Sequence, residues 1–491
     1  MKHALIKTVF AVFILSLINL LSHAVSPRPM EHLDRGVVAI NQGKGNVFIS
    51  WRLLGTDPRA IGFNLYRENG EERVKLNAKP IQNRTWFQDT NVELTQTVSY
   101  RVKPVVNGKE QSASKAYALK KNTSPQPFLS IPLQTPVGST PNDASVGDLD
   151  GDGEYEIILH QASRGRDNSQ SGVTGPAILQ AYKLDGALLW TIHLGRNIRE
   201  GAHYTQFMVY DFDGDGKAEI ACKTADGTVD GTGRVIGDAN ADYRNEHGYI
   251  LAGPEYLTIF DGQTGKALAT TDYIPPRHPK TLHPSPDQIK KMWGDGYGNR
   301  VDRFLACVAY LDGKRPSLVM CRGYYTRTVL AAWNWREDEL RHLWTFDSDD
   351  STQKNQAYRG QGYHSLAVGD VDRDGKDEII YGACAIDDDG TGLYSTNLGH
   401  GDAMHLSDID PKRPGLELFG IHERPNHPYG ANLRDADTGE VIWGLQLSDP
   451  GRGLAMDIDP RYPGYECWTN DSDGLYSCKG QKITSAKPRS C

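Results

Sequence analysis

The stretch Gly147-Asp148-Leu149-Asp150-Gly151-Asp152-Gly153-Glu154-Tyr155-Glu156-Ile157-Ile158 decides the fold class of this chain. Its three aspartates alternate with other residues, a glycine follows the third, and the chain then continues into apolar, β-branched residues. The glycine permits a sharp bend, so the carboxylates converge and offer Ca²⁺ the oxygen ligands that it prefers. An EF-hand would need Glu at the twelfth position, where Leu159 stands. The stretch therefore predicts a calcium loop between two β-strands.

The motif recurs along the chain, in full at Asp211 and Asp370 and without the third aspartate at Asp408 and Asp457. Repeats of about 40 to 60 residues made of short strands and turns are typical of a β-propeller. The long interval before Asp370 has room for further units, for example around 256–261 and 304–309. Solvated turn acids without an ion are the alternative. We expect structural calcium ligands at Asp148, Asp150, Asp152, Glu156, Asp211, Asp213, Asp215, Glu219, Asp370, Asp372, Asp374, Glu378, Asp408, Asp410, Glu417, Asp457, Asp459 and Glu466.

The N-terminal 24 residues have the pattern of a secretory signal peptide. Lys2 and Lys7 precede an apolar run that ends at Leu21, and small residues at 22 and 24 mark a cleavage site. Val25, not Cys, follows that site, so a lipid anchor has no attachment point there. We expect a secreted or periplasmic protein with no membrane partner. The formal charge of −8 also argues against a nucleic-acid partner.

The remaining chain divides into two parts. Short strands at 47–51, 63–66 and 100–105, separated by Asn-Gly turns, predict a fibronectin III-like or immunoglobulin-like β-sandwich over residues 28–122. Five prolines then mark a linker at 123–141, and the propeller is predicted over 142–491. A helix is expected at 285–292, where Ser and Pro form an N-terminal cap.

The seven cysteines are widely spaced, and their odd number leaves at least one outside any intrachain bridge. Such spacing favours buried small apolar residues over a disulfide framework. If one bridge exists, Cys467 and Cys478 form the first pair to consider.

Polar residues that are not part of the repeat stand at matching positions before or after the repeated loops. In a propeller such positions form a ring around the central axis, so we expect a common site. Taken singly, each histidine fits an ordinary hydrogen-bonded residue better than a site residue, and only the set favours a common site. The residues are Asn142, Asp143, His203, His364, His400, Asp402, His422, Glu423 and Arg452.

Long motifs at 201–219, 223–228, 399–402 and 451–464 resemble the rhamnogalacturonan lyases of polysaccharide lyase family eleven. The motif at 399–402 reads Gly399-His400-Gly401-Asp402. The resemblance implies an all-β fold in which an eight-bladed calcium-loop propeller follows an N-terminal β-module. It also implies that rhamnogalacturonan I is cleaved by β-elimination at galacturonate, and we expect a monomer that binds this polysaccharide.

The resemblance further assigns roles to site residues. It implies that Asn142 contacts rhamnose, that Arg452 is the active-site arginine, and that a catalytic Ca²⁺ is held by Asp143, His364, His400, Asp402 and Glu423. Imidazole is an unusual ligand for Ca²⁺, so another metal at this site is an open alternative. Guanidinium hardly ever deprotonates, so Arg452 is expected to stabilise charge and position substrate.

The chain departs from the family pattern after residues 474–480. The family continues with an Asn-Gly-Thr-Lys segment, whose lysine is a candidate base, and this segment is absent here. We therefore expect a C-terminally truncated, incomplete propeller. A propeller that binds pectin or a protein partner through calcium, without catalysis, is the alternative function.

Overall fold

The computed structural model describes residues 28, 31–423 and 428–489, and it confirms the all-β class. The predicted signal peptide and Cys491 lie outside these residues. Within the described ranges, no helix has the length and apolar character needed to cross a membrane.

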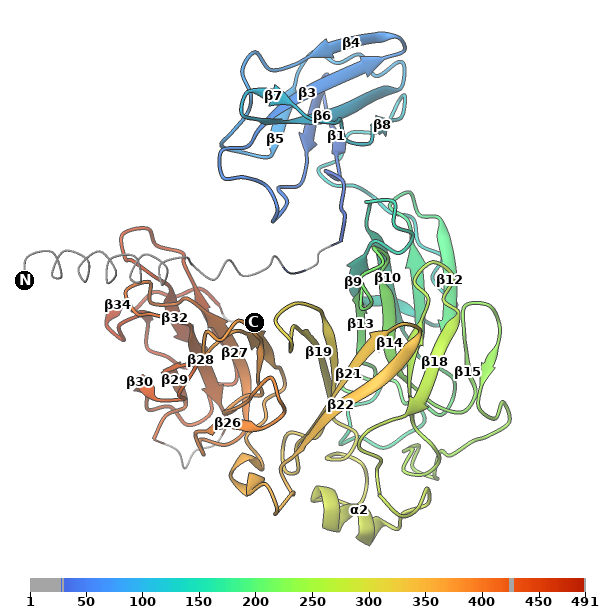
Figure 1. Cartoon of the computed structure of the whole chain (residues 1–491), viewed down its shortest axis with the longest axis vertical. Helices are drawn as coiled ribbons and strands as arrows, with labels where there is room; N and C mark the ends of the chain where they lie inside the picture. The colour runs from blue at the N-terminus through green and yellow to red at the C-terminus, as the bar shows by residue number, and fades with distance from the viewer. Residues whose placement is uncertain (1–27, 29–30, 424–427, 490–491) are drawn as a thin grey trace, which may run out of the picture.

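Two antiparallel sheets form the N-terminal module at the top of Figure 1. Trp51, Phe63 and Tyr100 are buried between their strands. One sheet contains β1 (Val38–Gly43), β2 (Asn46–Ser50) and β5 (Trp86–Asp89), and the other contains β3 (Gly62–Asn69), β4 (Glu72–Lys75), β6 (Val98–Val106), β7 (Lys109–Glu110) and β8 (Tyr117–Leu119).

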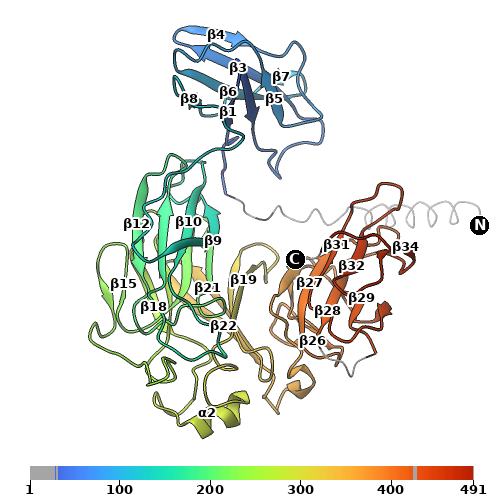
Figure 2. The ribbon, with the colours of Figure 1, turned by 180° about the vertical axis from the view of Figure 1, so that it is seen from behind.

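The rest of the described chain forms six antiparallel sheets, each with four strands in chain order, and the first sheet carries two further short strands. Figures 1 and 2 show them following one another from green to red. They are β9 (Thr140–Gly147), β10 (Glu156–Ala162), β11 (Ile178–Tyr182), β12 (Leu188–His193); β13 (Phe207–Tyr210), β14 (Glu219–Thr224), β17 (Tyr256–Phe260), β18 (Ala267–Asp272); β19 (Phe304–Ala309), β20 (Ser317–Arg322), β21 (Val329–Arg336), β22 (Glu339–Asp347); β23 (Ala367–Gly369), β24 (Glu378–Ile380), β25 (Cys384–Ile386), β26 (Gly392–Ser395); β27 (Gly401–Ser407), β28 (Glu417–His422), β29 (Ala431–Asp435), β30 (Val441–Leu445); and β31 (Gly453–Met456), β32 (Glu466–Thr469), β33 (Leu475–Ser477), β34 (Lys482–Thr484).

The first strand of each sheet contacts the first strand of the next, from β9 through β13, β19, β23 and β27 to β31. The cores lie between neighbouring sheets. Trp190 of the first sheet, for example, shares a buried cluster with Phe260 of the second. Each sheet therefore stabilises its neighbours by burying one apolar face against them.

Of the two further repeat units expected from the sequence, one begins a sheet of its own and the other belongs to the second sheet. Residues 304–309 begin the third sheet as β19, as expected, whereas 256–260 form β17, the third strand of the second sheet. The connection before β17 also contributes β15 (Thr228–Val229) and β16 (Val235–Ile236), which extend the first sheet beyond β12. Sequence periodicity did not distinguish a third strand from a first one, because both are buried apolar runs.

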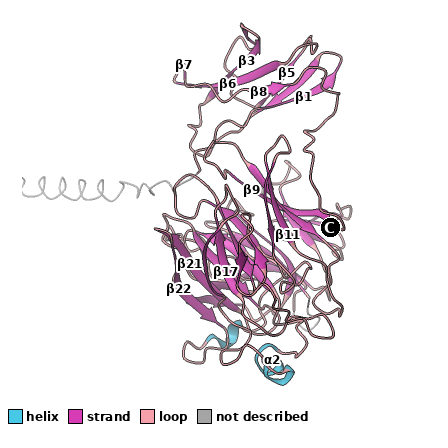
Figure 3. Ribbon diagram, turned by 90° about the vertical axis from the view of Figure 1, so that its right-hand side faces the viewer, coloured by secondary structure: helices cyan, strands magenta, loops and turns pink. Residues whose placement is uncertain are grey.

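The predicted helix is present as α2 (Pro286–Trp293), at the end of the molecule remote from the N-terminal module (Figures 1 and 3). Ser285 and Gln288 form a capping box, and Gly294 ends the helix in the left-handed conformation. One short 3₁₀-helix, η1 (Asn355–Tyr358), also occurs in the described chain.

The six described cysteines are buried and none forms a disulfide bond. This confirms the expectation of buried apolar residues, and Cys467 and Cys478 are not bridged.

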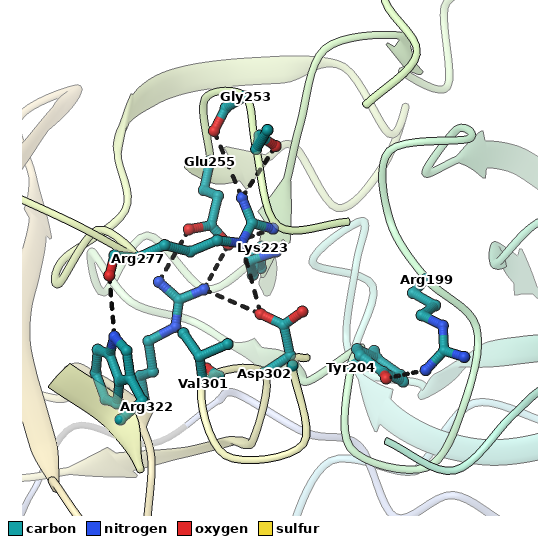
Figure 4. A network of polar contacts seen from close by, with 12 residues as sticks. Arg199, Tyr204, Lys223, Gly253, Glu255, Arg277, Val301, Asp302 and Arg322 are labelled. Atoms are coloured by element: carbon teal, nitrogen blue, oxygen red, sulfur yellow. Dashed lines mark hydrogen bonds and ion pairs between the residues drawn. The ribbon is translucent and has the colours of Figure 1, made fainter. Parts of the chain in front are cut away.

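A network of buried charges joins the second and third sheets (Figure 4). Glu255 pairs with Arg322 at 2.6 Å, with Arg277 at 3.0 Å and with Lys223 at 3.1 Å. Asp302 accepts from Arg322 at 3.3 Å. Burial opposes ionisation of Glu255, but the three cations hold its pKa below the usual range.

We expect Glu255→Gln to lower the free energy of unfolding by about 3–5 kcal/mol, because it leaves three buried cations without their main counter-charge. Urea denaturation measures the change. Glu339→Gln is the control, since Glu339 is exposed and pairs with Arg341 on the surface. Equal effects of the two variants would contradict the prediction.

Candidate active site and metal centres

The candidate ligands lie at two opposite ends of the repeated sheets. The aspartate-rich loops connect the first strand to the second, for example 148–155 between β9 and β10. The unrepeated polar residues lie at the opposite end, where first strands begin and second strands finish. The strand length therefore separates the two groups of candidate ligands.

The three complete loops gather their carboxylates as the sequence predicts. Donor atoms lie within 4.8 Å of one another in the groups Asp148/Asp150/Glu156, Asp211/Asp213/Asp215 and Asp370/Asp372/Asp374. In each loop the later glutamate accepts a backbone N–H from the residue after the first aspartate. These distances are 2.9 Å for Leu149–Glu156, 2.9 Å for Phe212–Glu219 and 2.7 Å for Val371–Glu378.

The loops have the electrostatics of a cation site. Burial raises the pKa of Glu219 to about 9, and the nearby Asp213 adds to the shift. Burial likewise raises the pKa of Glu378 to about 8. Asp370 Oδ1 and Glu378 Oε1 are buried with no hydrogen-bond partner in the described chain. These acceptors fit a hard cation, which would supply the missing positive charge.

The two shorter loops differ from the complete ones. The Lys479 ammonium contacts Asp410, and Arg461 pairs with Asp459 at 2.5 Å. Asp408 and Asp457 are exposed. Glu417 and Glu466 still accept backbone N–H groups, at 3.0 Å from Ile409 and Ile458. Side-chain cations therefore neutralise much of the charge that these loops gather.

At the opposite end, four predicted ligands and the predicted arginine lie together. His364, His400 and Asp402 each place a donor atom within 4.8 Å of the other two. Glu423 Oε2 lies 3.3 Å from His400 Nε2, and Asp402 Oδ1 lies 3.5 Å from His364 Nε2. Arg452 Nη1 is 3.4 Å from Asp402 Oδ2. We call these five residues the histidine–carboxylate cluster.

Hydrogen bonding orients His400 as a ligand. Its Nδ1 lies 2.5 Å from the Gly362 carbonyl, which can only accept, so Nδ1 carries the proton. In the neutral ring the lone pair on Nε2 then faces the Glu423 carboxylate. Two acceptors 3.3 Å apart share either a proton on Nε2 or a metal ion, so the donor set fits a metal ion when the ring is neutral.

Burial, helped by nearby charges, keeps the His364 imidazole neutral. Burial lowers the pKa of His364 to about 3, helped by His400, His203 and two arginines. Neutral imidazole is the form that binds metals. Burial raises the pKa of Asp402 to about 6, although Arg452 opposes the shift.

Tyrosines from the third sheet support the cluster, and the sequence did not single them out for this role. Tyr324 OH lies 3.2 Å from His364 Nδ1 and 3.4 Å from His203 Nδ1. Tyr325 OH lies 3.0 Å from His364 Nε2, and its ring centroid is 4.1 Å from that of His400. Two adjacent tyrosines could indicate a surface on which sugars stack, but packing in the core was the simpler interpretation of the sequence.

Three candidates have other surroundings. Asn142 and Asp143 are exposed on β9 of the first sheet, and their side chains make no hydrogen bond or ion pair with the described residues. The cluster takes its side chains from the fourth, fifth and sixth sheets. His422 is buried beside Tyr363, whose hydroxyl lies 2.8 Å from His422 Nδ1.

Comparison with known proteins defines the class. Residues 129–491 match the C-terminal domain of rhamnogalacturonan lyase family 11, and residues 28–119 match the rhamnogalacturonan I lyase β-sheet domain. The chain is 55% identical to rhamnogalacturonan endolyase YesW of Bacillus subtilis, over 94% of this chain and 72% of that protein. It is 54% identical to rhamnogalacturonan exolyase YesX of the same organism, over 94% of this chain and 75% of that protein.

Solved structures agree with this assignment. The family 11 rhamnogalacturonan lyase of Bacillus licheniformis superimposes with a TM-score of 0.85 at 57% identity, over 93% of this chain and 76% of that one. The crystal structure of YesW gives a TM-score of 0.86 at 54% identity, over 94% of this chain and 77% of that one. The class is that of the polysaccharide lyases. The chain belongs to rhamnogalacturonan lyase family 11.

We expect Arg452→Gln to raise the pKa of Asp402 above about 6, because the guanidinium favours the carboxylate form. NMR titration of aspartate-labelled protein in chelator measures this pKa, with Asp402→Asn assigning the signal. An unchanged titration would contradict the ion pair seen here.

Proposed function

We propose that this protein cleaves the rhamnogalacturonan I backbone of pectin by metal-assisted β-elimination at galacturonate. The observation that supports the proposal best is the histidine–carboxylate cluster, in which Arg452 lies next to Asp402. Its donors suit a divalent cation, and its partly exposed arginine suits an anionic sugar. Membership of the lyase family gives the reaction type.

The reaction removes the proton on C5 of galacturonate and breaks the bond between C4 and its oxygen. A C4–C5 double bond forms, and the leaving oxygen receives a proton. Negative charge accumulates on the neighbouring carboxylate as the C5 proton departs. A divalent cation, when bound, supplies Lewis-acid stabilisation of that charge.

The residues of this chain would divide the remaining work. His364, His400, Asp402 and Glu423 would hold the cation, with Tyr324 and Tyr325 fixing the imidazoles. Arg452 is half-exposed and near Asp402, so its guanidinium would orient the uronate and stabilise its developing charge. Asp143 could act as a metal ligand, and Asn142 as a sugar contact, only if β9 approaches the cluster.

We propose Ca²⁺ as the ion, both here and in the complete loops. Asp402 and Glu423 supply the oxygen ligands at the cluster, and the uronate would supply more. We further propose that the six sheets are blades of a calcium-loop propeller, that the N-terminal module is a fibronectin III-like or immunoglobulin-like sandwich, and that the protein is exported. The succession of contacting first strands supports the propeller.

We expect the purified protein with Ca²⁺ to release unsaturated uronides from rhamnogalacturonan I, detected by their ultraviolet absorbance. Arg452→Gln should lower kcat by about 100-fold, because charge stabilisation in the transition state is lost. Asp402→Asn should raise the calcium concentration needed for activity. Asp338→Asn, in an exposed turn, is the control. Oligosaccharide binding without cleavage would support the non-catalytic alternative instead.

We expect chelation to lower the melting temperature and Ca²⁺ to restore it. An ion at 100 times its Kd stabilises the folded state by about 2.7 kcal/mol per site. Asp370→Asn should reduce the calcium-dependent shift, because it removes a ligand from the loop of the fourth sheet, whereas Asp338→Asn should not. Calorimetry with and without chelator measures the shift, and identical curves would refute structural calcium.

A further inference from the structure

We propose that Arg300 binds the carboxylate of a second galacturonate, beside the one that is cleaved. This inference rests on the proposed function and adds an anion subsite to it. The ligand class is a uronate within the same polysaccharide chain.

Arg300 is half-buried and has no acidic partner. It makes no hydrogen bond or ion pair with any described residue. Its neighbours differ in this respect, since Arg303 lies 3.8 Å from Asp167 and Arg452 lies 3.4 Å from Asp402. The guanidinium of Arg300 thus keeps its donors for a ligand, and it suits a carboxylate because two parallel N–H groups match the two oxygens.

The position of Arg300 connects it to the cluster. Its guanidinium carbon lies 3.9 Å from the ring centroid of Tyr325. That ring in turn lies 4.1 Å from the ring of His400, and its hydroxyl is 3.0 Å from His364 Nε2. Arg300 is therefore one aromatic ring away from two metal ligands. Galacturonate alternates with rhamnose in the substrate, so a second carboxylate recurs two sugars from the cleaved residue.

The segment 299–303 that carries Arg300 is held rigidly. Asp302 lies in the buried charge network, 3.3 Å from Arg322 and 3.6 Å from Arg277 (Figure 4). The Arg303 carbonyl accepts from Gly323 N at 2.7 Å, and Arg303 Nε donates to the Asn299 carbonyl at 2.9 Å. A fixed backbone lowers the entropic cost of binding an anion at Arg300.

The net charge of the surroundings also favours an anion. The network below the segment contains three cations, Lys223, Arg277 and Arg322, against two carboxylates, Glu255 and Asp302. Arg303 also lies 5.3 Å from the Tyr325 ring, but Asp167 at 3.8 Å balances its charge, so the excess comes from the network. This excess should attract uronates, and the attraction should weaken with salt.

The test compares Arg300→Gln with wild type on polymeric rhamnogalacturonan I and on the shortest oligosaccharide that wild type cleaves. We expect the KM for polymer to rise about tenfold with kcat nearly unchanged, because one charged hydrogen-bonded contact is lost. The KM for the short oligosaccharide should change by less than twofold, and the salt dependence of the polymer KM should weaken. Arg300→Lys should recover part of the affinity. Arg341→Gln, on exposed β22, is the control.

Binding without turnover provides a second measurement. In an Arg452→Gln background, whose turnover is expected to be about 100-fold slower, adding Arg300→Gln should weaken calorimetric affinity for a multi-galacturonate fragment by about tenfold. If wild type cleaves and both measurements equal those of the Arg341→Gln control, this inference is overturned and the proposed function stands. If wild type forms no unsaturated product, the proposed function fails independently of Arg300.

Discussion

The packing of one first strand against the next, from β9 to β31, is the constraint on which the rest of the structure depends. It aligns the beginnings of strands that are far apart in sequence. His364, Asp402 and Arg452 thereby meet at one end, although each comes from a different sheet. The same packing places the aspartate loops at the other end, where they cannot contribute ligands to the cluster.

Electrostatics distinguishes the complete aspartate loops from the shorter ones. In the complete loops, burial and neighbouring aspartates raise the pKa of carboxyls such as Glu378, and Asp370 Oδ1 is buried without a hydrogen-bond partner among the described residues. In the shorter loops Lys479 and Arg461 provide positive charge from the protein itself. The buried network around Glu255 uses the same solution inside the molecule, because an unpaired buried charge would be more costly.

Overall sequence identity to the relatives does not distinguish endo-cleavage from exo-cleavage. Identity is 55% to an endolyase and 54% to an exolyase. Such a difference must depend on local features around the substrate path. Arg300 and the segment that carries it are the kind of feature that can bind sugars beyond the cleaved bond without altering the core.

The sequence by itself determined the all-β class, the aspartate loops and the capped helix, and its nine polar candidates include the five members of the histidine–carboxylate cluster. These depend on local patterns: carboxylates bent by glycine, a capping box, and matching positions within a repeat. It did not predict that Tyr324 would link His203 with His364, that Arg300 would lie on Tyr325, or that Lys479 would reach Asp410. Only the tertiary structure decided those contacts, because they join separate segments whose distance is set by how the sheets pack.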